Sequence, residues 1–64
     1  MKSYSSKEVI SILKSNGWQL IRVVGSHHQF SRPDKPGTVT VPHPRKNLPI
    51  KTVRSIFKQA GVEE

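Results

Sequence analysis

The chain has 64 residues and a formal net charge of +7, with eleven Lys or Arg residues, four Asp or Glu residues and no cysteine. This composition predicts one small domain, and it argues against disulfide frameworks, thiolate zinc sites and the paired carboxylates of two-metal nucleases and glycosidases. The positive charge instead favours a polyanionic partner, with nucleic acid first and an acidic membrane surface second.

The first predicted element is a helix over residues 6–16. Ser5 and Glu8 have the spacing of a capping box, in which each residue's side chain accepts a hydrogen bond from the other's backbone amide. The residues that follow place apolar side chains on one helical face at Val9, Ile10, Ile12 and Leu13. Gly17 then supplies a left-handed residue that ends the helix.

Three strands are expected after this helix, over residues 18–24, 27–32 and 38–41. The first is rich in β-branched and aromatic residues, but its apolar residues do not alternate cleanly, so its orientation in the sheet stays open. A Gly25-Ser26 turn precedes the second strand, and a run of turn formers at residues 33–37 precedes the third. Short turns between successive strands predict an antiparallel meander.

A basic, proline-rich loop over residues 42–49 leads to a second helix that begins between Pro49 and Thr52 and ends at Gly61. Its apolar stripe consists of Ile50, Val53, Ile56, Phe57 and Ala60. Because each helix has one stripe to bury, we expect both to cover the same face of the sheet. The predicted fold class is α+β, in the order α-β-β-β-α, with a single domain over residues 1–64.

The residues available for chemistry are three histidines and the dispersed basic side chains. His27 and His28 are adjacent on a predicted strand and point to opposite faces, so they do not chelate one ion, and we predict no metal site and no cofactor. RNA cleavage without a metal needs fewer groups from the protein, because the ribose 2′-OH of the substrate is the nucleophile. The protein has to move protons, for which His is suited, and to stabilise phosphate charge with Lys or Arg.

The second strand separates the histidines by face. Phe30 is its only large apolar side chain, so the face of Phe30 should meet the helices. His27 then lies on the open face, either as a reactive imidazole or as a solvated polar residue. His28 shares the face of Phe30 and fits a partly buried histidine, hydrogen-bonded to backbone, better than a catalytic one. His43 fits a loop residue better than a substrate contact.

The densest basic pair is Arg45-Lys46 in the proline-rich loop, and it is the best phosphate contact that the sequence offers. Arg22 is a further candidate. The alternative is that these charges serve only the solubility of a small domain. The glycines form no phosphate-binding GxxxxGK or GxGxxG motif.

Three segments resemble a known family: residues 25–30 (GSHHQF), 40–44 (TVPHP) and 53–61 (VRSIFKQAG). With the Gly17-Trp18 pair at the end of the first helix, they resemble the HicA family of small bacterial and archaeal toxins, which act as mRNA interferases. The resemblance covers residues 6–62. It implies a fold like that of double-stranded-RNA-binding domains, which agrees with the element order predicted above.

The resemblance also implies the site and the partners. The catalytic histidine of the family's Gly-Ser-His motif falls on His27, with Gly25 and Ser26 as its supporting turn. The family cleaves RNA without a metal or the ribosome and is neutralised by a HicB antitoxin. Where many members read Val-Pro-x-His, His43 here directly follows Pro42, so no role is assigned to it.

The predicted function is therefore that of a toxin endoribonuclease that cleaves mRNA, with a HicB-type antitoxin covering the polar sheet face and the basic loop. One alternative is a non-catalytic RNA-binding module of the same fold. Another is an interaction module whose basic surface docks an acidic protein. No apolar run approaches the length of a membrane span and no signal-peptide pattern is present, so we expect a cytoplasmic protein with no membrane partner.

Overall fold

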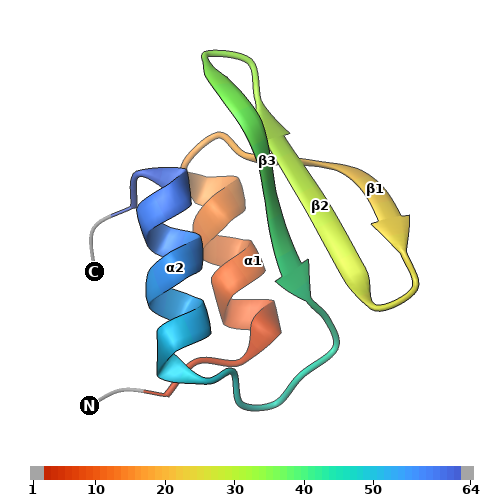
Figure 1. Ribbon diagram of the computed structural model, residues 1–64, viewed down its shortest axis with the longest axis vertical. Helices are drawn as coiled ribbons and strands as arrows, with labels where there is room; N and C mark the ends of the chain where they lie inside the picture. The colour runs from red at the N-terminus through yellow and green to blue at the C-terminus, as the bar shows by residue number, and fades with distance from the viewer. Residues whose placement is uncertain (1–2, 63–64) are drawn as a thin grey trace.

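The computed structural model describes residues 3–62. In chain order its elements are α1 (Ser6–Ser15), β1 (Gln19–Val24), β2 (His27–Arg32), β3 (Lys35–Pro42) and α2 (Ile50–Ala60) (Figure 1). This order confirms the predicted α+β fold class. Within the described residues, no helix is both long and apolar enough to cross a membrane.

The capping box begins α1 as predicted. The Glu8 backbone N–H donates to Ser5 Oγ at 3.1 Å, and the Ser5 N–H donates to Glu8 Oε1 at 3.1 Å. The helix ends one residue earlier than predicted, because Asn16 is its C-cap and Gly17 follows with a φ of +88°. The buried face of α1 consists of Ser6, Val9 and Leu13.

The three strands form one antiparallel sheet in the order β1-β2-β3. The irregularity in β1 lies between Leu20 and Arg22, where Ile21 is the extra residue of a bulge. Leu20 pairs with Phe30 and Val23 pairs with His28, so both lie on the helix side of the sheet. The bulge therefore explains why the apolar residues of this strand do not alternate.

Three predicted strand boundaries were wrong, among them the end of β3, which lies at Pro42 instead of residue 41. β1 begins at Gln19 because Trp18 turns into the core, where its indole N–H donates to the Ala60 carbonyl oxygen at 3.2 Å. β3 begins at Lys35 instead of residue 38. Lys35 pairs with Arg32 and Val39 with Phe30, so the expected turn formers at residues 36–37 lie inside an irregular strand segment.

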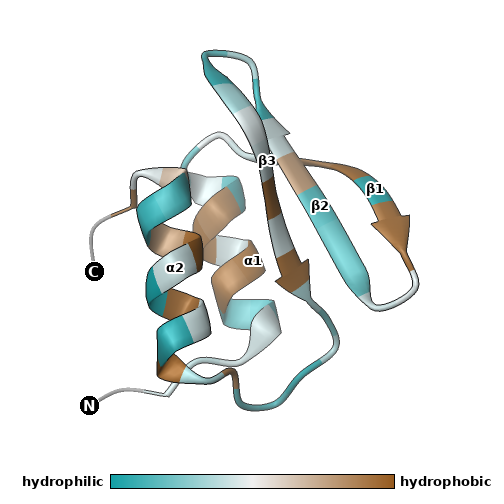
Figure 2. Ribbon diagram, in the orientation of Figure 1, coloured by the Kyte–Doolittle hydropathy of each residue, from teal (hydrophilic) through white to brown (hydrophobic). Residues whose placement is uncertain are grey.

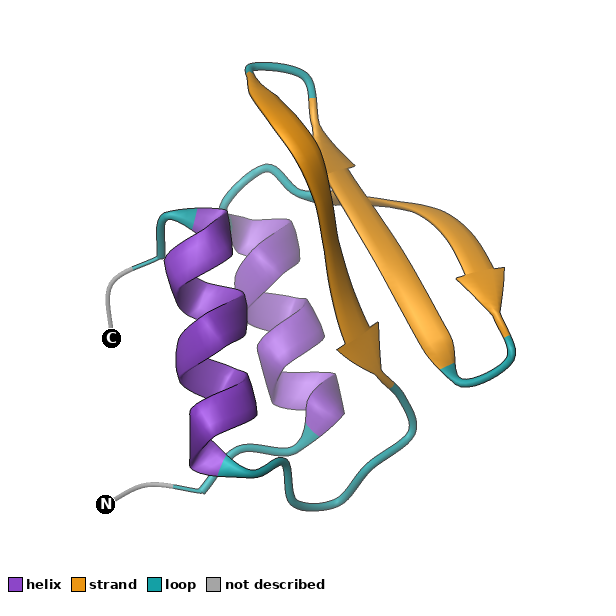
Figure 3. Ribbon diagram, in the orientation of Figure 1, coloured by secondary structure: helices purple, strands orange, loops and turns teal. Residues whose placement is uncertain are grey.

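Both helices lie on one side of the sheet and pack against β3, as Figures 1 and 3 show. The core between the two layers is apolar, and its largest members are Trp18, Phe30, Leu13 and Phe57. Figure 2 shows hydrophobic segments, coloured brown, on both helices and on β3. β1 lies at the edge of the sheet away from the helices (Figure 1).

Candidate active site

The sheet face opposite the helices places His27 in the open. Cross-strand partners in an antiparallel sheet share a face, so Val24 and Pro42, which pair with His27, flank it on either side. The next row on the same face holds Arg22 and Gln29, and Arg22 Nε donates to Gln29 Oε1 at 2.5 Å. The predicted placement of His27 on an open polar face is confirmed, because its side chain is exposed while Phe30, on the other face of the same strand, is fully buried.

The turn before His27 is built by Gly25 and Ser26. Gly25 has a φ of +59°, and no residue other than glycine has a positive φ in the described chain. A two-residue hairpin with Gly at its first position and a positive φ only there is typical of a type II′ turn. The Ser26 carbonyl oxygen accepts a hydrogen bond from the His43 N–H at 2.8 Å, so the turn is also bonded to the end of β3. The backbone that carries His27 is thus held from both sides.

His28 and His43 meet on the helix side of the sheet. Their ring centroids lie 4.7 Å apart with an angle of 80° between the ring planes, an edge-to-face contact. His28 is partly buried, as predicted, but its Nδ1 is buried with no hydrogen bond to any described residue. The expected backbone bond is therefore not made by Nδ1, and the ring of His43 is the neighbour instead.

Ser6 fixes the ring of His43. Ser6 is 1% exposed, and its Oγ lies 2.6 Å from His43 Nδ1. The same oxygen accepts a hydrogen bond from the Arg45 N–H at 2.8 Å and lies 3.2 Å from the Arg45 carbonyl oxygen. Its single hydroxyl hydrogen can be donated to the imidazole or to that carbonyl, so Ser6 can serve either tautomer of His43.

Sequence reasoning missed this contact between α1 and the basic loop. The signal available was the position of Ser6, three residues before Val9 and seven before Leu13 on the helical face that is otherwise apolar. A polar residue in that stripe needs a hydrogen-bond partner in the core. The identity of the partner was not readable, because 37 residues separate Ser6 from His43.

Arg45 and Lys46 lie in a different place from Arg22. Together with Lys7 they line a hollow of about 480 Å³ at the N-terminus of α1, whose full lining is Ser5, Ser6, Lys7, His43, Pro44, Arg45 and Lys46. Arg22 lies on the open sheet face in the row next to His27. The structure thus divides the predicted phosphate contacts into one residue beside the histidine and two on the loop beside α1.

Comparison with known families decides the relationship that the motifs indicate. The family model described as the HicA toxin of bacterial toxin–antitoxin systems matches residues 6–62. The chain belongs to the HicA toxin family. A HicA toxin acts in a toxin–antitoxin system, so this chain has a cognate antitoxin. No curated protein matches the chain significantly.

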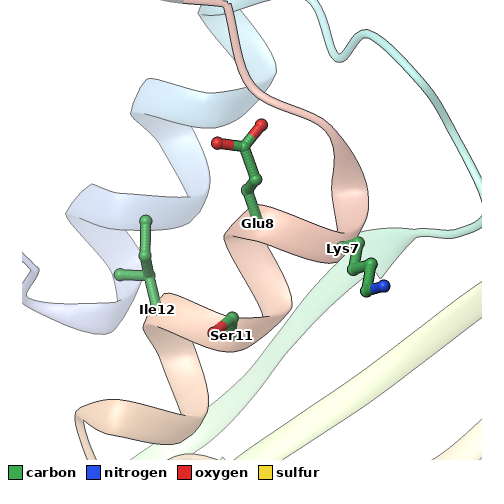
Figure 4. A pocket seen from close by; sticks show the side chains of 4 residues that line it. All are labelled: Lys7, Glu8, Ser11 and Ile12. Atoms are coloured by element: carbon green, nitrogen blue, oxygen red, sulfur yellow. The ribbon is translucent and has the colours of Figure 1, made fainter.

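Within this HicA fold, the open face is the better candidate for the active site. A hollow along α1 is lined by Lys7, Glu8, Ser11 and Ile12 (Figure 4). Glu8 is engaged in the capping box and Ile12 packs against the core. This hollow therefore offers no pair like His27 and Arg22, in which an acid–base group lies beside a basic side chain that can bind phosphate. Across residues 3–62, no cluster of three or more His, Asp or Glu side chains is placed to hold a metal ion.

Proposed function

We propose that this HicA toxin is an endoribonuclease that cleaves mRNA, with His27 as its general acid/base. The observation that carries the proposal is the open-face arrangement of His27, exposed beside Arg22 and carried by a turn that is held on both sides. An imidazole titrates near neutral pH and a guanidinium neutralises phosphate, which are the two functions that metal-free RNA cleavage requires.

The proposed reaction is attack of the ribose 2′-oxygen on the adjacent phosphorus. A bond forms from the 2′-oxygen to phosphorus, and the bond from phosphorus to the 5′-oxygen breaks. The 2′-OH loses a proton and the departing 5′-oxygen gains one, and His27 is the group that we assign to this proton transfer. The products are a 2′,3′-cyclic phosphate and a 5′-OH. Arg22 stabilises the charge that develops on the phosphate oxygens, while Gly25 and Ser26 position the imidazole.

The loop residues Arg45 and Lys46 are proposed to bind the RNA backbone away from the scissile phosphate. Their place beside Lys7 makes a second positive region at the N-terminus of α1. Contacts of this kind add affinity that falls with salt but carry no sequence information. Because the proposed substrate is mRNA, we expect the toxin to act in the cytoplasm.

The cognate antitoxin is proposed to be of the HicB type and to cover the open face and the basic loop. The chain carries +7 overall, so a contact surface with negative charge on the antitoxin would be electrostatically complementary. Covering His27 and Arg22 would prevent RNA from reaching the site, which accounts for neutralisation without any change in the toxin's fold.

Growth arrest in bacteria tests the proposal. Wild type and His27→Ala are expressed from a tightly controlled promoter without antitoxin, with Gln19→Ala as the matched control. Gln19 pairs with Ser31 and so lies on the same open face at the opposite end of the sheet. We expect wild type and Gln19→Ala to arrest growth and degrade mRNA, and His27→Ala to do neither while accumulating as folded protein.

A toxic His27→Ala protein would point to the non-catalytic alternative. An RNA-binding module would act by occupying mRNA. Its toxicity would depend on its affinity for RNA and not on the presence of the His27 imidazole. The two functions separate in the fate of the RNA, because only the nuclease shortens it.

A further inference from the structure

The edge strand β1 exposes an apolar surface that the proposed RNA chemistry does not use. The large apolar side chains that are exposed within the described residues all belong to this strand, with exposures of 45–54%: Leu20, Ile21, Val23 and Val24. Leu20 and Val23 lie on the helix side, yet the helices pack against β3 and leave them uncovered (Figures 1 and 2). Val24 lies on the open face beside His27.

The backbone of β1 is also available along its outer edge. Among residues 3–62 the strand pairs only with β2. Val24 and His27 flank a two-residue turn and therefore form a hydrogen-bonded pair. In an antiparallel sheet this directs the N–H and C=O of the preceding residue, Val23, away from β2. The free edge thus combines unpaired backbone groups with apolar side chains.

The opposite edge of the sheet has the features that normally prevent strand addition. β3 contains Pro36 and Pro42, which have no backbone N–H, and begins with a lysine. β1 contains no proline or lysine, and its single charge, Arg22, is turned to Gln29 on the open face. Natural sheets protect edges that stay unpaired, so the difference marks β1 as the edge that is built to be covered.

We infer that β1 binds an extended strand of an acidic protein, which adds to the sheet as its fourth strand. The charge of the chain selects this occupant over a second copy, because two chains that each carry +7 repel one another, whereas an acidic strand is attracted. Backbone hydrogen bonds supply affinity in such strand addition, and alternate apolar side chains supply specificity. The inference deepens the proposed antitoxin contact and rests on the proposed function for the consequence of binding.

The consequence is that strand addition at β1 reaches the active site. Neighbouring strands lie about 4.8 Å apart, so a strand added to β1 runs about 10 Å from β2. A side chain on its open face, level with Val24, therefore extends toward His27 and across the row that holds Arg22. An antitoxin that docks in this way blocks the access of RNA to the open face.

Binding of the cognate antitoxin to edge variants tests the inference. Val23→Glu places a negative charge on the outer edge of β1, and Thr38→Glu makes the same charge change on an exposed residue of β3. We expect Val23→Glu to weaken antitoxin binding, measured by titration calorimetry, by about tenfold or more, since it removes a valine that the added strand would cover and adds like-charge repulsion. Thr38→Glu should bind like the wild type.

Hydrogen exchange of the complex gives a second readout that does not depend on a variant. The amides of β1 should become protected on binding the antitoxin. Equal affinities for the two variants, or unchanged exchange in β1, would overturn the inference. Self-association of the antitoxin-free wild type that Val23→Glu abolishes would overturn it too, because the occupant would then be a second copy. RNA cleavage by the wild type alone reports separately on the proposed function.

Discussion

Removing the hydroxyl of Ser6 tests whether a single buried side chain holds the basic loop against α1. In Ser6→Ala the Arg45 N–H loses its acceptor at 2.8 Å and His43 Nδ1 loses its partner at 2.6 Å. Leaving a buried polar group without a partner costs about 1–3 kcal/mol, and both contacts here are only partly buried, so we expect a loss of about 2 kcal/mol in the free energy of unfolding. The better helix propensity of alanine offsets roughly half a kcal/mol of this at most.

The expected loss is large for a chain of this size. A domain of 64 residues has a total stability of roughly 3–10 kcal/mol, and each kcal/mol shifts the melting temperature of a small domain by about 4–8 °C. Thermal unfolding followed by circular dichroism should therefore show Ser6→Ala melting about 10 °C below the wild type. Ser11→Ala is the control, because Ser11 is an exposed residue of the same helix and should change stability by less than about 0.5 kcal/mol.

Hydrogen exchange locates the effect in the loop. The Arg45 amide is bonded to Ser6 Oγ in the wild type, so its exchange should become faster in Ser6→Ala and stay unchanged in Ser11→Ala. Equal melting temperatures for the two variants, with an unchanged Arg45 amide, would refute the reasoning that the hydroxyl ties loop and helix together.

Three further predictions concern the open face. Gly25→Ala and Gly37→Ala should each lower the free energy of unfolding by about 1 kcal/mol, because both glycines have a positive φ and open space where an alanine Cβ would lie. Only Gly25→Ala should slow RNA cleavage beyond its effect on stability. Arg22→Gln should weaken RNA binding and flatten its salt dependence by about 0.7 in the log–log slope, whereas Arg54→Gln on the exposed face of α2 should weaken RNA binding far less; equal effects on binding would remove Arg22 from the site. EDTA should leave cleavage intact and mass spectrometry should find cyclic phosphate and 5′-OH ends, whereas 5′-phosphate ends would contradict attack by the 2′-OH.

The parts of the fold that the sequence predicted correctly depend on local signals. The capping box at Ser5 and Glu8 and the left-handed glycines after each helix act within a few residues, so the helix limits were predicted to within one residue. The parts that failed depend on pairing between strands. The bulge at Ile21 and the irregular start of β3 exist because of the register with β2, and no local pattern encodes that register.

The candidate site divides in the same way. His27 could be assigned to the open face because Phe30, three residues on, marks the other face of the same strand. The contact of His43 with Ser6 and His28 could not be predicted, since it depends on the path of the loop that leads from β3 to α2 and passes the N-terminus of α1. The path of this loop also places Arg45 and Lys46 beside Lys7 and away from Arg22.

The most direct test of the central claim is the rate of RNA cleavage by purified His27→Ala compared with the wild type. His27 is an exposed residue of the open face, so its replacement should change stability by no more than about 0.5 kcal/mol, which thermal unfolding verifies in the same samples. We predict that the folded variant yields no cleavage products from an RNA that the wild type cuts to completion. Cleavage by folded His27→Ala at the wild-type rate would contradict the assignment of His27 as the acid/base.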